Sequence, residues 1–540
     1  MRFLLLAVLA ASGCGDDDDQ PADAGDEPRD AGVDAEVDAA DDDDGTQVET
    51  AEGPLQGKLV GETRAFLGIP YAAPPLGDLR WRSPRPVEPW VQVRTAATVG
   101  RPCPQFDVGG SLRGGSDEDC LTLNVWTPAE VTEPAPVMVW IHGGGWEQGT
   151  GGDPAFDGQN LSERGGVLVV TLNYRLGPLG WLALPELSAE DPDHPASGDW
   201  GLEDQRAALE WVQRNIAAFG GDPDNVTLFG ESAGGFNTCL HLVSPPSQGL
   251  FARAIMQSGS CSWAFRTPES AEAVGADLVT RLGCEGEGVL ACLRAADVEA
   301  LLEARPGNET EVDFPWFPVV DGLSLVEQPR EAIARGDLVD VPVMAGTNGD
   351  EGTFLTVFGS LSDVEEEGYE DAIAWLAGEK DAPVIAAEYP VADFDSVQDA
   401  LAELIGDALF ICPTRRLVRG VVAGGQDAFL YSFEHVPEFA PESLGSFHGA
   451  EIPFVFSNPM FGSEIAGSEE PLSDAMMGYW TAFAAAGDPN GGAEVAWPAY
   501  DPDSEGYLVL EEPIAAGEHL AQERCDFWDG IPLGLPGESK

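Results

Sequence analysis

The stretch from Asn225 to Val243 constrains the fold of this chain more than any other. A short apolar run, Asn225–Phe229, predicts a buried strand, and apolar residues at helical spacing follow from Phe236. Between them lies Gly-Glu-Ser-Ala-Gly, residues 230–234. Gly-x-Ser-x-Gly between a strand and a helix is typical of a sharp turn that exposes a serine nucleophile, and its glycines avoid a clash where strand and helix meet. We therefore predict that Ser232 is a nucleophile.

Apolar runs bounded by turn residues recur along the chain. They are Pro136–Ile141, Val167–Leu172, Asn225–Phe229, Ala254–Met256, Val341–Ala345 and Phe429–Phe433. Helical patterns lie between them, most clearly over Leu202–Ala218. Alternating buried strands and helices predict an α/β fold, with a large, mostly parallel central sheet and helices on both faces. In such sheets functional residues lie just beyond the carboxyl ends of the strands.

The first 50 residues differ in composition from the rest of the chain. Residues 1–13 combine Arg2 with a short apolar run and small residues, which is typical of a secretory signal peptide. Residues 15–50 contain 16 acidic residues, one basic residue and almost no large apolar side chain, so they cannot bury enough surface to fold. We predict a signal peptide over 1–13, an extended acidic tether over 14–50 and one folded domain over 51–540.

The chain is strongly acidic, with 94 acidic against 27 basic residues and a net charge of −67 at pH 7. Nucleic acid is not expected as a partner, because binding a polyanion depends on basic contacts. Most of the acidic excess lies outside residues 15–50 and therefore belongs to the folded domain. A saline habitat is one hypothesis for such a surface, which stays soluble in salt. The other hypothesis is a biased genome composition, which would also favour arginine over lysine.

A series of further motifs occurs in one order between residues 51 and 530. They are Glu118–Val125, His142–Trp146 (His-Gly-Gly-Gly-Trp), 198–205 (Gly-Asp-Trp-Gly-Leu-Glu-Asp-Gln), 219–223 (Phe-Gly-Gly-Asp-Pro) and the turn at 230–234. Together they resemble the type B carboxylesterases, the α/β-hydrolase family that includes the cholinesterases and para-nitrobenzyl-esterase-like bacterial enzymes. The resemblance implies an α/β-hydrolase fold, a small-molecule ester as substrate, hydrolysis through an acyl-enzyme intermediate, and no cofactor.

A serine nucleophile needs a histidine to take its proton, and in α/β-hydrolases this histidine comes last in the chain. Only His435, His448 and His519 come late enough. His448, in Phe-His-Gly-Ala-Glu, resembles the catalytic-histidine loop of the family, so we expect it to be the base. His435 is the alternative, and His519 lies in an acidic stretch where we expect an exposed side chain.

The acid that orients the histidine should lie between Ser232 and His448. Composition cannot select it, because acidic residues occur throughout this region. Residues 346–352 (Gly-Thr-Asn-Gly-Asp-Glu-Gly) resemble the Asp-Glu-Gly turn of the family. The resemblance implies Glu351 as the acid, with Asp350 as the alternative.

A glycine-rich loop follows the predicted strand Pro136–Ile141, in the position where α/β-hydrolases bind the oxyanion of the reaction. The resemblance implies that the donors are the backbone N–H groups of Gly144, Gly145 and Ala233. We expect His142 to shape this loop rather than to transfer protons.

The resemblance also assigns roles around the nucleophile. Glu231, which precedes the serine, supports the site electrostatically in the family. Trp263 and Phe317, together with Phe314 and Trp316, are candidates for the acyl pocket, with ordinary core packing as the alternative for each.

The nine cysteines indicate export. The signal segment ends in Ser-Gly-Cys, which resembles a bacterial lipobox and implies a lipid on Cys14; the alternative is an ordinary signal peptide with an incidental cysteine. A lipid would hold the protein at the periplasmic face of a membrane or at the cell surface. Release of the protein from the membrane is the alternative. We expect this anchor to be the only membrane contact. Eight cysteines remain, an even number that suits an oxidising compartment.

The cysteine pattern of the family suggests three disulfides, Cys103–Cys120, Cys284–Cys292 and Cys412–Cys525. Cys239, on the helix after the nucleophile, and Cys261, just past the following strand, then remain. We expect them to form a fourth bridge near the active site.

The loop between Cys103 and Cys120 bears on the substrate. In cholinesterases this loop carries a tryptophan that binds the choline cation, and no tryptophan occurs here. We therefore expect uncharged esters. Two alternatives stay open: a catalytically silent cholinesterase-like binding or adhesion protein, and the same triad acting on an amide, carbamate or lactone. Neither a metal site nor a nucleotide phosphate-binding loop is expected.

Overall fold

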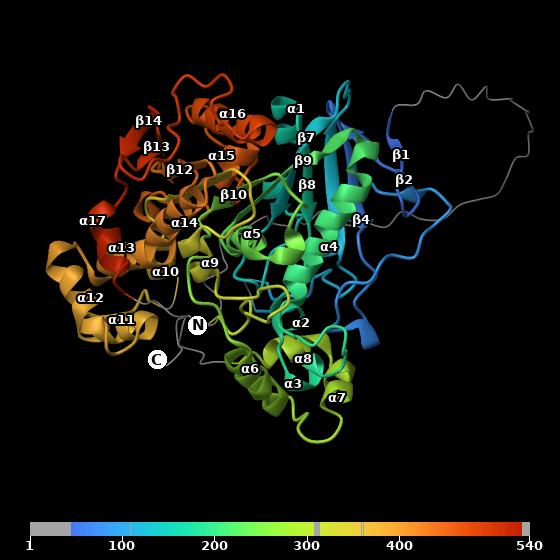
Figure 1. Cartoon of the computed structure of the whole chain (residues 1–540), viewed down its shortest axis with the longest axis horizontal. Coiled ribbons are helices and arrows are strands. Elements are labelled where there is room, and N and C mark those ends of the chain that lie inside the picture. Colours follow the sequence, from blue (N-terminus) through green and yellow to red (C-terminus); the bar gives the residue numbers. More distant parts are fainter. Residues whose placement is uncertain (1–44, 108–109, 307–313, 358, 360, 532–540) are drawn as a thin grey trace, which may run out of the picture.

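An eleven-stranded sheet forms the centre of the molecule in the computed structural model (Figure 1), which describes residues 45–107, 110–306, 314–357, 359 and 361–531. Its strands, in spatial order, are β14 (Ala515–Glu518), β13 (Gly506–Leu510), β12 (Ala428–Phe433), β11 (Val343–Asn348), β10 (Arg253–Gln257), β9 (Gly221–Glu231), β7 (Ala135–Ile141), β8 (Leu168–Leu172), β6 (Thr122–Pro128), β4 (Thr63–Pro70) and β3 (Lys58–Val60). The strands from β13 to β8 are parallel to one another, whereas β14 at one edge and β6, β4 and β3 at the other are antiparallel to their neighbours.

The strands of the central sheet face a hydrophobic core on each side. In β7, Val137, Val139 and Ile141 belong to one core, whereas Met138 and Trp140 belong to the other. Successive side chains of a strand point to opposite faces, so a strand buried on both faces is apolar at every position. This explains the continuous apolar runs of the sequence and confirms the predicted mostly parallel α/β sheet.

Helices cover both faces of the sheet. The helices are α1 (Gln159–Gly165), α2 (Gly177–Trp181), α3 (Pro185–Ser188), α4 (Trp200–Asn215), α5 (Ala233–Val243), α6 (Pro268–Arg281), α7 (Val289–Ala295), α8 (Val298–Glu303), α9 (Pro329–Arg335), α10 (Thr353–Val357), α11 (Tyr369–Ala377), α12 (Ala382–Glu388), α13 (Val397–Gly406), α14 (Cys412–Ala423), α15 (Ile452–Phe456), α16 (Glu470–Ala486) and α17 (Gln522–Trp528). Apolar residues of α4, α5 and α14 share the core with Val137, whereas those of α1, α15 and α16 share the core with Trp140.

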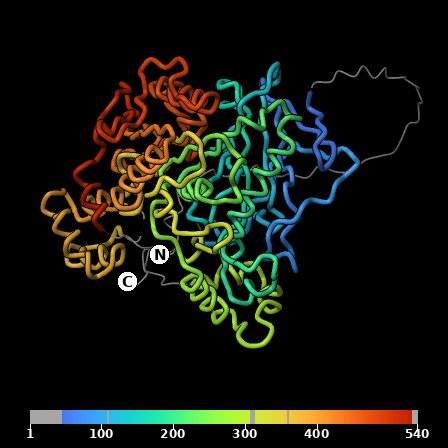
Figure 2. Tube along the Cα trace, in the orientation of Figure 1, coloured from blue at the N-terminus to red at the C-terminus, as the bar shows by residue number. Residues whose placement is uncertain are grey.

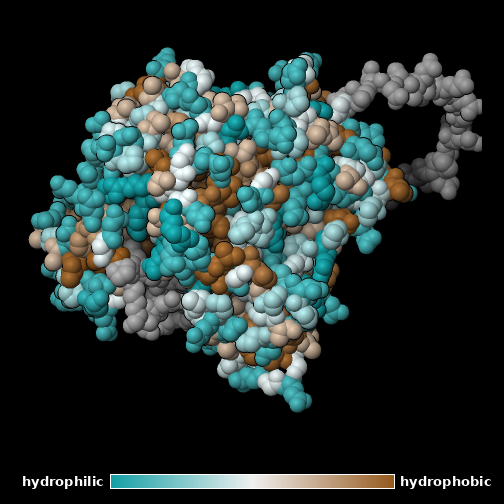
Figure 3. Space-filling model, viewed as in Figure 1, coloured by the Kyte–Doolittle hydropathy of each residue, from teal (hydrophilic) through white to brown (hydrophobic). Residues whose placement is uncertain are grey.

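The chain crosses the sheet from one edge to the other. Figure 2 shows the blue N-terminal strands on one side and the red C-terminal segments on the other. Figure 3 shows a face that is mostly hydrophilic at its periphery, with hydrophobic residues gathered near its centre. Across the described ranges, every helix is too short or too polar to cross a membrane.

The folded region begins before residue 51. A small sheet joins β1 (Gln47–Glu49), β2 (Pro54–Gln56) and β5 (Arg94–Thr95), so β1 lies in the segment that the sequence assigned to the tether. Val48 is buried and pairs with Leu55, so this part of the segment makes an apolar contact that its acidic composition did not indicate. The predicted signal peptide, Cys14 and the tether up to residue 44 lie outside the described residues.

Four disulfides join the expected cysteines: Cys103–Cys120, Cys239–Cys261, Cys284–Cys292 and Cys412–Cys525. Disulfides of this number are typical of proteins in oxidising compartments, so they indicate an exported protein.

Candidate active site

Ser232 lies at the tip of a tight turn between β9 and α5. Its φ of 54° and ψ of −125° are strained for a residue with a side chain. The turn fits only because Gly234 lacks a Cβ, which would lie 2.0 Å from the carbonyl oxygen of Ile141. Ser232 N–H donates to the Gln257 carbonyl at the end of β10, at 2.9 Å. Two neighbouring strands therefore hold the serine at the carboxyl edge of the sheet.

The glycine-rich loop after β7 passes directly against this turn. A Cβ on Gly143 would lie 3.1 Å from the Cβ of Ser232, so the two backbones approach as closely as glycine permits. Gly144 and Gly145 have φ values of +104° and +61°, which turn the loop around the serine. The glycine-rich loop therefore packs against the turn that carries Ser232.

Two side chains brace the glycine-rich loop from behind. His142 stacks on Tyr174 with 4.5 Å between ring centroids, and burial lowers the pKa of His142 to about 4, so this histidine is neutral. The side-chain amide of Gln105 binds both backbone groups of Gly149. Its Oε1 accepts from Gly149 N–H at 3.0 Å, and its Nε2 donates to the Gly149 carbonyl at 2.8 Å. Gln105 was not among the predicted site residues; its only signal was its place in the first disulfide loop.

His448 and Glu351 meet through a short contact. His448 Nδ1 lies 2.5 Å from Glu351 Oε2, and Glu351 Oε1 accepts from Asn348 N–H at 2.8 Å. Glu351 is buried at 1% exposure. The two loops are joined by a bridge in which Asp350 N–H donates to the Ser446 carbonyl at 3.1 Å. A backbone hydrogen bond therefore connects the turn after β11 to the loop that carries His448.

The two alternative residues have other partners. Asp350 accepts hydrogen bonds from the N–H and the hydroxyl of Ser446, at 2.9 and 3.1 Å. His435 Nε2 lies 2.8 Å from a carboxylate oxygen of Glu469.

Glu231 faces the other side of the His448 ring. Its Oε1 lies 3.3 Å from His448 Nε2, which places the ring next to the residue before Ser232. Burial by itself lowers the pKa of His448, but Glu231 and Glu351 outweigh it and raise this pKa from 6.5 to about 9. Burial also raises the pKa of Glu231, to about 8. The His448 ring therefore lies between two carboxyl groups, that of Glu351 at Nδ1 and that of Glu231 at Nε2.

A second layer of polar residues lies behind Glu351. Glu451 is fully buried and accepts from Asn348 Nδ2 at 2.7 Å and from Gln257 Nε2 at 3.0 Å. Gln257 Oε1 in turn accepts from Trp480 Nε1 of α16 at 3.0 Å. An unbroken chain of hydrogen bonds thus connects α16 to the acid. No role in the site was predicted for these residues, although Glu451 lies in the histidine motif, and Gln257 and Asn348 lie one and three residues beyond predicted strands.

An aromatic group extends from the glycine-rich loop. The centroid of the Trp146 ring lies 4.5 Å from that of Phe317 and 5.7 Å from that of Phe236. The centroids of the Phe236 and Trp263 rings are 5.1 Å apart. Phe314 lies over Gly145, since a Cβ there would be 3.4 Å from its ring. The predicted pocket residues Trp263 and Phe317 are therefore connected through rings, and Trp146 and Phe236, which were not predicted, complete the group.

Comparison with known proteins identifies the family. The sequence model described as the carboxylesterase family matches residues 44–528. This chain belongs to the carboxylesterase family. It is 36% identical to a cholinesterase of Mus musculus over 510 residues, covering 87% of this chain and 83% of that protein. It is 35% identical to carboxylesterase 1D of Rattus norvegicus over 534 residues, covering 90% and 93%.

A solved structure agrees with this assignment. The chain superposes on a PNB esterase with a TM-score of 0.80 and 36% identity, covering 90% of this chain and all of that one. The predicted α/β-hydrolase fold is confirmed, and the chain is a serine hydrolase of carboxylic esters with a small-molecule substrate, as its family implies.

Proposed function

We propose that Ser232, His448 and Glu351 form the catalytic triad of this carboxylesterase. His448 takes the Ser232 hydroxyl proton as the serine oxygen attacks the ester carbonyl, and Glu351 stabilises the imidazolium. The protonated ring then gives its proton to the leaving alcohol, and water hydrolyses the acyl-enzyme by the same steps. The observation that carries the proposal is the 2.5 Å contact between His448 Nδ1 and the buried carboxylate of Glu351.

The negative charge that develops on the carbonyl oxygen needs donors on the far side of Ser232 from the base. The N–H groups of Gly144, Gly145 and Ala233 are proposed for this role. Each donor of this kind contributes about 3 kcal/mol to transition-state stabilisation. Support comes from the close approach of the glycine-rich loop to Ser232, which only glycine allows.

The proposed substrates are uncharged carboxylic esters rather than choline esters. The first disulfide loop has no tryptophan, and it carries Arg113, whose Nη1 donates to Gln105 Oε1 at 3.3 Å. Gln105 holds Gly149 of the glycine-rich loop, so this guanidinium lies close to the site. A positive charge here repels a quaternary ammonium, whereas a neutral ester pays no such penalty.

A lipid on Cys14 is the proposed means of retention at a membrane after export. The proposal rests on the Ser-Gly-Cys end of the signal segment and on the acidic residues that follow it. An extended, self-repelling tether would hold the catalytic domain away from the lipid surface. Labelling with a radioactive fatty acid tests this step, because a Cys14→Ser chain would lose the label.

Hydrolysis of p-nitrophenyl esters of rising acyl length tests the catalytic proposal, with Ser232→Ala as the paired variant. We expect wild-type turnover on this panel and a loss of about 10⁶-fold in kcat for Ser232→Ala. Undiminished turnover in the variant would overturn the triad. No wild-type turnover would favour a silent binding protein, and faster turnover of matched amides, carbamates or lactones would reassign the substrate.

A further inference from the structure

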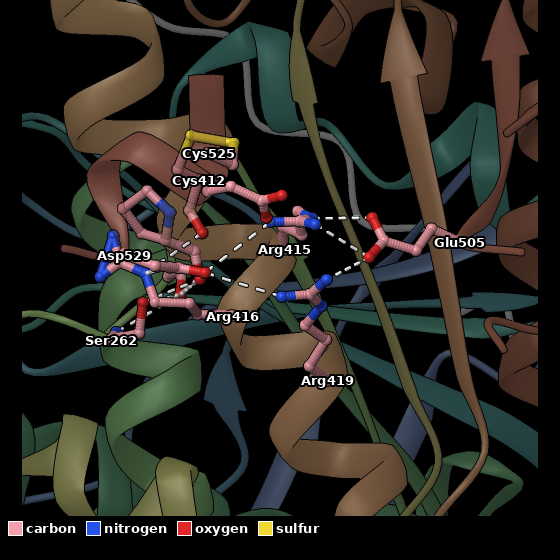
Figure 4. A network of polar contacts seen from close by, with 11 residues as sticks. Ser262, Cys412, Arg415, Arg416, Arg419, Glu505, Cys525 and Asp529 are labelled. Atoms are coloured by element: carbon pink, nitrogen blue, oxygen red, sulfur yellow. Dashed lines mark hydrogen bonds and ion pairs between the residues drawn. A yellow bond between two sulfur atoms is a disulfide. The ribbon is translucent and has the colours of Figure 1, made fainter. Parts of the chain in front are cut away.

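The segment from Ser258 to Phe265, which carries Trp263, has almost no regular secondary structure and is held instead by specific bonds. The disulfide Cys239–Cys261 ties it to α5. The hydroxyls of Ser260 and Ser262 both donate to the carbonyl oxygen of Pro413, each at 2.8 Å. Figure 4 shows Ser262 next to the start of α14, where Cys412 lies. The segment is therefore fixed from two sides, by a covalent bond and by paired hydroxyls.

The Trp263 ring depends on this segment for its position. Its side chain is buried at 7% exposure, and its indole N–H has no hydrogen-bond partner among the described residues. Trp146 differs, because its N–H donates to Asn237 at 2.9 Å. A ring without such a bond is placed by packing and by its own backbone alone. The Trp263 backbone lies two residues beyond the bridged Cys261.

The bridge and the Trp263 ring join the same two elements. The ring of Phe236, three residues before Cys239 on α5, packs edge-on against Trp263 at 5.1 Å. Phe236 N–H donates to the Ser232 carbonyl at 2.8 Å, so Phe236 lies one helical turn from the serine. Trp263 thus joins the aromatic group through Phe236, and the bridge ties its segment to the helix that follows the nucleophile.

We propose that the Cys239–Cys261 disulfide is a positioning device that holds Trp263 against Phe236 and thereby limits the length of the acyl group that the enzyme accepts. The inference rests on the proposed function, since it assumes an acyl group bound beside Ser232. Without the bridge, the segment keeps its hydroxyl contacts to Pro413, the bond from Ser258 N–H to Gly346 and the paired bonds between Phe265 and Gln328, but it loses its covalent connection to α5. The indole then moves away from Phe236, and the apolar space beside the serine lengthens.

The test compares Cys239→Ala/Cys261→Ala with Cys284→Ala/Cys292→Ala, which removes a bridge of the peripheral α6–α7 connection. The kcat/KM values for p-nitrophenyl decanoate and butyrate are measured, with active sites counted by a fluorophosphonate probe. We expect the decanoate-to-butyrate ratio to rise about tenfold without the first bridge, the discrimination that pocket length commonly provides. We expect a change below about twofold in the control.

Two further variants separate positioning from stability. In a Trp263→Leu background, removal of the Cys239–Cys261 bridge should leave the ratio unchanged, because residues that act through one another are not additive. Ser262→Ala removes one hydroxyl contact but keeps the bridge, so it should raise the decanoate-to-butyrate ratio by a smaller factor. This variant tests the inference if the bridge variant fails to fold.

Three results would overturn the inference: an unchanged ratio without the bridge, an equal change in the control, or an unchanged ratio in Ser262→Ala when the bridge variant does not fold. Each would leave the triad intact, because wild-type hydrolysis and its loss in Ser232→Ala are measured separately.

Discussion

His448 Nδ1 and Glu351 Oε2 lie 2.5 Å apart, although the two residues are separated by 97 positions in the chain. The contact forms because β11 and β12 are parallel neighbours whose carboxyl ends meet at one edge of the sheet. Asp350 shares the turn with Glu351 but faces Ser446. Adjacent carboxylates thus have different partners, and this distinction can be tested.

Glu351→Gln should lower kcat by about 10³- to 10⁴-fold, because a neutral amide no longer stabilises the imidazolium. Asp350→Asn should lower kcat by less than about tenfold, and its cost should appear in stability through the Ser446 hydrogen bonds. Steady-state kinetics on a p-nitrophenyl ester and a urea melt measure both effects. A larger kcat loss in Asp350→Asn would make that residue the acid.

The pH dependence of activity should change in Glu231→Gln. His448 acts as a base only when neutral, so kcat/KM should rise with pH through the raised pKa of His448, near 9 in the wild type. Removing the Glu231 carboxylate lowers this pKa, and we expect the half-maximal pH to fall by about one unit or more. A pH–rate profile of each protein gives the value. An unchanged or higher half-maximal pH in the variant would contradict this assignment of charge.

Glu451→Gln should reduce kcat by roughly tenfold to a hundredfold with little change in KM, because it breaks one of the bonds that hold Asn348 and Gln257 behind the acid. The matched control is Glu469→Gln, a buried glutamate outside this hydrogen-bond chain that pairs with His435. The control should lose stability but keep its kcat. Equal kcat values in the two variants would show that Glu451 has only a structural role.

Arg415→Ala should destabilise the C-terminal part of the fold. Arg415 is 2% exposed and bonds both oxygens of the buried Glu505, at 2.7 and 2.9 Å; Figure 4 shows Arg419 on the same carboxylate. Loss of Arg415 leaves this carboxylate buried with less compensation, at a cost of about 3 kcal/mol. Arg281→Ala, which breaks an exposed pair with Asp277, should cost less than about 1 kcal/mol. Denaturant melts compare the two, and equal losses would count against the buried network.

Molar salt should raise the melting temperature of the wild-type protein. The net charge of −67 makes the folded state repel itself, and added ions screen this repulsion. The melting temperature is compared in low salt and in molar sodium chloride. If it stays constant or falls, self-repulsion does not limit the stability of the fold, and the saline-habitat hypothesis for the acidic composition is wrong.

Most of the fold was predictable because its signals are local. The strand, turn and helix around Ser232 are contiguous, and the apolar runs correspond to β7 to β12 within a few residues. The predicted helix Leu202–Ala218 is α4, Trp200–Asn215, followed by a short 3₁₀ turn. The N-terminal boundary was less accurate, because Val48 gains its apolar contact only when Leu55 folds back against it.

By itself, the sequence determined the class of fold, the position of the serine turn and, through resemblance, the family. These depend on periodicity and on motifs that neighbouring residues carry. Only the tertiary structure decided which groups surround the site, because Gln257 and Glu451 are 194 positions apart and meet where parallel strands end at one edge. It likewise decided that the Trp263 indole N–H has no hydrogen-bond partner in the described residues and that Trp263 lies two residues from a disulfide. A side chain's partners depend on packing in space, which local sequence does not encode.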